Sequence, residues 1–145
     1  MKSVIIVAAL MATSVAAHAG SWNSQQNLQK AVTAGVSAYN SGGLAAVASA
    51  SENCFKGLDI GWQNKDVQRD VEYCIALEST GLVIHNTASN LKANATYFDS
   101  DETLFAHWMN TLESARIVEL PEQFKPYLIP RLQTVSSLVK KQLKS

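Results

Sequence analysis

The sequence has no excess of charge of either sign. Its 145 residues include 12 Lys and Arg and 12 Asp and Glu, which gives a formal net charge of zero. Nucleic-acid-binding domains normally gather a basic excess on one face. The short basic tail of Lys140, Lys141 and Lys144 falls where a final helix would end, and cations there suit the negative end of the helix dipole. We therefore expect no nucleic-acid partner.

Motifs of catalysis and of cofactor binding are also missing from the sequence. It contains no P-loop, no GxSxG turn and no HExxH zinc motif. His85 and His107 lie far apart without the close ligand spacing of a zinc site. Met109 shares a predicted apolar helix face with Phe105, which favours a core methionine over a haem ligand. The sequence therefore predicts no metal, no cofactor and no catalytic residue.

Carboxylates are the remaining candidates for chemistry, because glycan-cleaving enzymes place two acids across a cleft. Glu72 and Glu78 lie on one predicted helix, and Asp99 begins the next with Glu102 three residues on. We interpret the two glutamates as a solvated helix face and the other two acids as a capping box. The prediction is a protein that is not an enzyme, with a small hydrolase as the less favoured alternative.

The first twenty residues have the order of a Sec signal peptide. Lys2 is followed by the apolar stretch Val4–Leu10 and then by small residues up to 17–19, Ala-His-Ala. Cleavage between Ala19 and Gly20 would leave residues 20–145 as a single domain. The alternative, a membrane anchor, needs about 20 consecutive apolar residues, and polar residues interrupt this run too early. We expect a periplasmic or secreted protein without stable membrane insertion.

Cysteine is scarce, and both cysteines fall in the exported part of the chain. Cys54 and Cys74 form neither a CxxC nor a CxxCH motif, which would indicate a redox or a haem site. An isolated pair in an oxidising compartment usually becomes a disulfide. The sequence predicts a structural Cys54–Cys74 bridge.

Apolar spacing by threes and fours predicts an all-α domain, and no stretch alternates like a strand. A four- or five-helix bundle is expected. Ser24 is the expected N-cap of the first helix, the glycines at 42 and 43 separate it from the second, and Asp99 is the expected N-cap of a later one. The prolines predict a short turn at Pro121 and a main helix that starts near Pro126 or Pro130. The predicted helices cover about residues 24–39, 44–56, 65–84, 99–112 and 121–143, and whether the third continues past residue 84 is left open.

Aromatic residues in predicted loops are the strongest indication of function. Trp62 lies in a glycine-flanked loop, and Tyr97 and Phe98 precede a helix. Trp and Tyr often anchor protein interfaces, so Trp62 and Tyr97 are our candidate partner-binding residues, while Phe98 is expected to pack as a hydrophobic staple. The leading hypothesis is a module that binds another protein, as immunity and inhibitor proteins do. The alternative is a periplasmic stress chaperone or assembly factor, and the oligomeric state is not predicted.

Overall fold

The computed structural model describes residues 22–87 and 96–144, and these residues contain helices and no strand. The predicted signal peptide, with its cleavage site between Ala19 and Gly20, lies outside the described residues. No described helix is long and apolar enough to cross a membrane. The elements are the helices α2 (Ser24–Lys56), α3 (Val67–Thr87), α4 (Asp101–Ser114) and α5 (Pro121–Lys144), with the 3₁₀ turn η1 (Thr96–Phe98) before α4.

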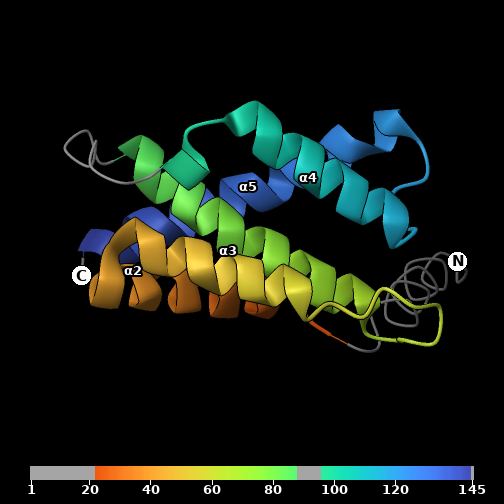
Figure 1. The fold of residues 1–145 in the computed structure, drawn as a ribbon, viewed down its shortest axis with the longest axis horizontal. Helices are drawn as coiled ribbons and strands as arrows, with labels where there is room; N and C mark the ends of the chain where they lie inside the picture. The colour runs from red at the N-terminus through yellow and green to blue at the C-terminus, as the bar shows by residue number, and fades with distance from the viewer. Residues whose placement is uncertain (1–21, 88–95, 145) are drawn as a thin grey trace, which may run out of the picture.

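Helix α2 consists of two helical halves joined at a glycine pair. Gly43 has a φ of +69°, a left-handed conformation that favours glycine, and Gly42 is also non-helical. Figure 1 shows the chain reversing direction at this point, so that the two halves of α2 run back along each other and beside α3. The break predicted between the first two helices is therefore present as a sharp turn.

The bundle is built around α3, which packs against each of the other helices. In Figure 1, α2 lies on one side of α3, α4 on the other, and α5 crosses behind. The predicted apolar stripe of α3 is buried from Val71 to Leu82, Val67 is partly buried, and α3 continues past Ile84 to Thr87. The main core of the molecule includes Val32, Val47, Val71, Ile75, Leu82, Phe98, Trp108, Leu112, Val135 and Val139.

The disulfide between Cys54 and Cys74 is present, which confirms the prediction. Cys54 lies in the last turn of α2, Cys74 is buried on α3, and their Cα atoms are 5.5 Å apart. The bridge ties the end of α2 to α3 at the base of the connecting loop. In the chain-entropy model, closing a loop of this length stabilises a fold by about 3 kcal/mol.

Two predicted N-caps are each displaced by one residue. The cap of α2 is Asn23 rather than Ser24, because the Asn23 side chain accepts a backbone N–H at 3.1 Å. The cap of α4 is Ser100 rather than Asp99, and Asp101 is then the first helical residue. Ser24 and Asp99 use their side chains in contacts with other helices instead, as described below.

The expectation for the prolines of the last helix is wrong, because α5 is continuous from Pro121. Pro121 occupies the first helical position, where its missing N–H costs nothing. Pro126 and Pro130 lie inside the helix, are both exposed and are four residues apart. The two lost hydrogen bonds therefore fall on one solvent-facing side of the helix, so neither break places an unpaired backbone group in the core.

Candidate functional site

The loop between α2 and α3, residues 57–66, presents the most exposed of the large apolar side chains in the described part of the chain. Trp62 is 88% exposed and Ile60 is 44% exposed. Single exposed apolar side chains are ordinary on protein surfaces. A tryptophan side chain with so large an exposed fraction is unusual, because tryptophan is highly buried on average. Trp62 is thus where the sequence placed it, in a surface loop, and its role in binding stays a prediction.

Hydrogen bonds within this loop hold its backbone in one shape. The Asp59 carboxylate accepts from the Gly61 N–H at 2.9 Å, and the Asn64 side chain donates to the Asp59 carbonyl oxygen at 2.6 Å. The Asn64 side chain also accepts from the Asp66 N–H at 3.0 Å, at the start of α3. Side-chain hydrogen bonds of this kind define turns, so the loop that contains Trp62 is held by its own hydrogen bonds. The disulfide also links the helix before the loop to the helix after it.

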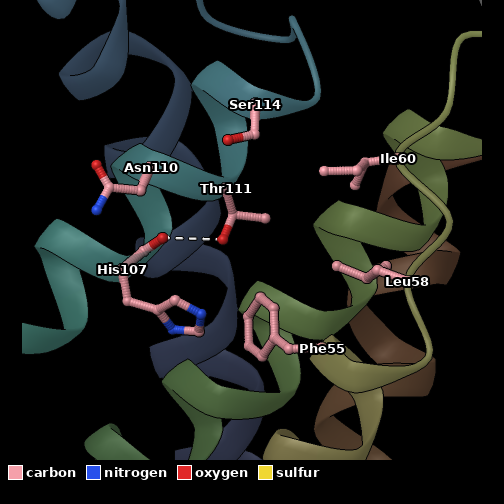
Figure 2. Close-up of a pocket in the computed structure, with 7 residues that line it drawn as sticks. All are labelled: Phe55, Leu58, Ile60, His107, Asn110, Thr111 and Ser114. Carbon is pink, nitrogen blue, oxygen red and sulfur yellow. Dashed lines mark hydrogen bonds between the residues drawn. The ribbon is translucent and has the colours of Figure 1, made fainter.

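Beside this loop lies a groove between α4 and the end of α2, with a volume of about 230 Å³. We call it the α4 groove. Figure 2 shows its two sides: α4 carries the polar residues, and the apolar side chains lie opposite α4, at the end of α2 and on the loop. The Asn110 side chain points away from the apolar side. The polar wall consists of His107, Asn110, Thr111 and Ser114, and the apolar wall of Phe55, Leu58 and Ile60.

His107 is fixed at this groove by a buried carboxylate on α3. Glu78 is fully buried, and its oxygen Oε2 lies 3.3 Å from His107 Nδ1. The same carboxylate accepts hydrogen bonds from the indole N–H of Trp108 and from the hydroxyl of Tyr97. Three donors from η1 and α4 thus meet one buried acceptor, as burial of a carboxylate requires.

The charge of Glu78 acts on the titration of its neighbours. The hydrogen bond to Glu78 raises the pKa of His107, against a smaller opposing effect of burial. Burial and the same carboxylate raise the pKa of Tyr97, which keeps its hydroxyl protonated. The His107 ring also lies against Phe55, with ring centroids 4.3 Å apart. The result is an oriented imidazole whose side chain is 42% exposed.

A second buried glutamate lies on α3 away from the groove. The Glu72 carboxylate accepts from Arg131 Nε at 2.8 Å, from the Asn27 side chain at 3.0 Å and from the Ser24 hydroxyl at 2.7 Å. Arg131 in turn stacks on Tyr127, with its guanidinium carbon 3.8 Å from the ring centroid. This cluster contains a buried ion pair between Glu72 and Arg131 and links α2, α3 and α5, so we interpret it as structural.

The interpretation of Glu72 and Glu78 as a solvated face is therefore wrong. Both carboxylates are buried, with exposures of 1% and 0%. One signal for Glu78 was present in the sequence, because residue 78 follows Cys74 by four positions and precedes Leu82 by four. It therefore falls on the apolar stripe of its helix. No sequence pattern identified His107 as its partner.

The other predicted residues have the following positions. The Tyr97 side chain is half-buried and its hydroxyl is bonded to Glu78, so the partner-binding role suggested for it stays a prediction. Phe98 is buried against α3, where an added Cβ at Gly81 would overlap its ring. His85 lies 3.4 Å from Asp99, away from His107.

The groove offers an imidazole but no assembled reaction centre. The Thr111 hydroxyl donates to the His107 carbonyl oxygen at 2.9 Å, as Figure 2 shows, rather than to the imidazole ring. Within residues 22–87 and 96–144, no group of three or more His, Cys, Asp or Glu side chains could hold a metal ion. The chemistry available in the groove is hydrogen bonding and proton exchange at His107 beside an apolar wall.

Comparisons with known proteins find no counterpart for this chain. No protein-family model matches it, and neither a curated protein nor a solved structure is significantly similar to it.

Proposed function

We propose that this chain is an exported protein-binding module, of the immunity or inhibitor kind, that captures another protein through the loop of residues 57–66. The observation that supports this proposal is Trp62, 88% exposed on a loop that is hydrogen-bonded internally. A tryptophan held in place loses little conformational freedom when it enters a partner's pocket. Ile60, 44% exposed, extends the apolar surface on the same loop.

Export is supported by the disulfide and by the order of residues at the N-terminus. Disulfides persist in oxidising compartments, and Cys54–Cys74 is bridged. The residues before Gly20 have the charge and size pattern of a cleavable leader. N-terminal sequencing of the protein recovered from periplasm or medium tests this part, and a protein that retains Met1 in the cytoplasm contradicts it.

The distribution of exposed apolar side chains favours one defined partner over unfolded clients. Outside the loop, the large exposed apolar side chains of the described residues are Leu120, which lies just before α5, and Ile129 and Leu143, which lie in the middle and near the end of α5. A chaperone for unfolded chains needs a broad apolar surface. Strong binding of a hydrophobic dye by the native protein would favour the chaperone instead.

The decisive experiment compares Trp62→Ala with Ile129→Ala. Both variants remove an exposed large apolar side chain, but only Trp62 lies on the loop. The protein immobilised on a resin is used to capture its partner from envelope extract, and the dissociation constant of the identified pair is then measured. We expect Trp62→Ala to weaken binding by about tenfold or more, as interface tryptophans do, and Ile129→Ala to leave it unchanged.

Stability measurements separate an interface role from a packing role. A surface substitution normally changes the free energy of unfolding by less than about 0.5 kcal/mol, whereas Trp→Ala in a core costs about 3 to 5 kcal/mol. We expect both variants to have the same midpoint of urea unfolding as the wild type. Equal partner affinity for wild type and Trp62→Ala would exclude Trp62 as the anchor of the binding surface and contradict the proposal.

A further inference from the structure

The α4 groove combines two chemistries that meet at His107. One wall is apolar, and the Phe55 ring on it lies against the imidazole. The other wall comes from α4, whose polar residues Asn110, Thr111 and Ser114 also line the groove. Its volume, about 230 Å³, is below the 300 to 1,000 Å³ typical of drug-sized ligand pockets. The groove therefore has room for a group of about the size of one amino-acid residue.

The bond to Glu78 determines what the free ring nitrogen of His107 presents to this groove. A carboxylate only accepts, so His107 Nδ1 carries a hydrogen and Nε2 is left for a ligand. When the imidazole is protonated, Nε2–H donates. When it is neutral, Nε2 offers a lone pair, which repels an anion. His107 thus presents a hydrogen-bond donor for anions to the groove when it is protonated, and a hydrogen-bond acceptor when it is neutral.

We propose that the α4 groove is a binding site for a carboxylate attached to an apolar group, with the carboxylate on His107 Nε2 and the apolar group against Phe55 and Leu58. The source is either a free apolar acid or an acidic residue beside an apolar one in a peptide. The groove shares Leu58 and Ile60 with the loop proposed to capture a protein, but it does not include Trp62, and its test needs no natural partner.

The charged groups around His107 are consistent with a modest, proton-dependent affinity. From α3, Glu78 hydrogen-bonds to the ring, and from η1, Tyr97 bonds to the same carboxylate with its hydroxyl protonated. From α2 the ring meets Phe55, and the charge of Glu52 acts on Tyr97. Because the protonated histidine and Glu78 neutralise each other, the ligand gains mainly a hydrogen bond and apolar contact. A dissociation constant on the order of 1 mM is expected for so small a ligand.

The test is an NMR titration of the purified protein with two matched pairs of probes. Phenylacetate is compared with phenylacetamide, and acetyl-Phe-Glu-amide with acetyl-Phe-Gln-amide. We expect at least one acid to shift the groove resonances and to raise the measured pKa of the His107 ring, because a ligand that binds the protonated form must stabilise it. One pH unit above that pKa, the acid should bind about tenfold more weakly than well below it.

Two histidine variants identify the ring responsible. His107→Gln keeps a side-chain N–H toward Glu78 but removes the titration, so it should bind acid and amide equally. His85→Gln removes the histidine that pairs with Asp99 and should behave as wild type. If His107→Gln does not fold, the test rests on the wild type alone: the acid must raise the measured pKa of His107, and the absence of a rise contradicts the proposal. Equal binding of acid and amide by wild type, or no binding of either acid at about 50 mM, would overturn the proposal.

Discussion

The two buried glutamates of α3 lie less than two turns apart, yet they are neutralised in different ways. Glu72 faces Arg131, a cation at every accessible pH, at 2.8 Å. Glu78 faces His107 at 3.3 Å, with the neutral donors Tyr97 and Trp108 beside it. One carboxylate thus has a permanent counter-charge, and the other has a counter-charge that depends on pH.

The partner of Glu72 is covered by another side chain, whereas the partner of Glu78 is open to the surface. Arg131 is covered by Tyr127, whose pKa burial raises to about 12 despite the nearby guanidinium, so no second negative charge arises there. Glu78 lies behind a histidine that is 42% exposed in an open groove. We infer that the Glu72 cluster holds the helices together, whereas the Glu78 cluster links the core to the surface.

The largest effect should come from Arg131→Met, which leaves Glu72 buried without its cation. Removing one partner of a buried ion pair commonly costs 3 to 5 kcal/mol, because the remaining charge is uncompensated. Arg131 is 25% exposed, so we expect about 3 kcal/mol in urea unfolding. The double variant Glu72→Gln/Arg131→Met should recover part of this loss. A single variant within about 0.5 kcal/mol of wild type would show that Glu72 needs no cation.

Glu78→Gln should cost less, about 1 kcal/mol, because an amide retains most of the contacts. Its oxygen still accepts from Trp108, and its NH₂ can donate to the Tyr97 oxygen, so only the O–H of the half-buried Tyr97 loses its acceptor. Glu78→Leu removes the acceptor and should cost more than Glu78→Gln, by about 1 to 3 kcal/mol. Equal losses for the two variants in urea unfolding would contradict this view of the cluster.

The helical architecture was predictable because it follows from local patterns. Spacing of apolar residues by threes and fours indicated the regions of α2, α3, α4 and α5, and Gly42–Gly43 marked the reversal within α2. The Cys54–Cys74 bridge followed from the scarcity of cysteine and the leader-like N-terminus. Pro126 and Pro130 misled the prediction, because their shared exposure on α5 is a tertiary property.

The candidate site was less predictable because its contacts are distant in sequence. The glutamates look like surface residues until their partners are known, and Arg131 lies 59 positions after Glu72, as His107 lies 29 after Glu78. Nothing local to α3 indicates that α4 and α5 supply those partners. The position of Trp62 in a surface loop was predictable because local signals, the flanking glycines, bound that loop.

The smallest expected effect is a pH dependence of stability that arises at Glu78 and not at Glu72. The pKa of His107 is raised in the folded state above its ordinary value of about 6.5. A raised histidine pKa adds stability that is complete below about pH 6.5 and is lost as the pH rises through the folded pKa. Urea unfolding of wild type should therefore show stability falling above pH 6.5, by a modest amount because the ring is partly exposed.

Two variants assign that slope to its origin. His107→Gln cannot titrate, so its stability should fall less than that of wild type over the same pH interval. His85→Gln keeps the His107–Glu78 pair and is the matched histidine control, so its slope should lie closer to that of wild type than the slope of His107→Gln does. If wild type and His107→Gln instead show the same slope, the His107–Glu78 pair is not coupled to folding, and the contrast between the two glutamates is only one of exposure.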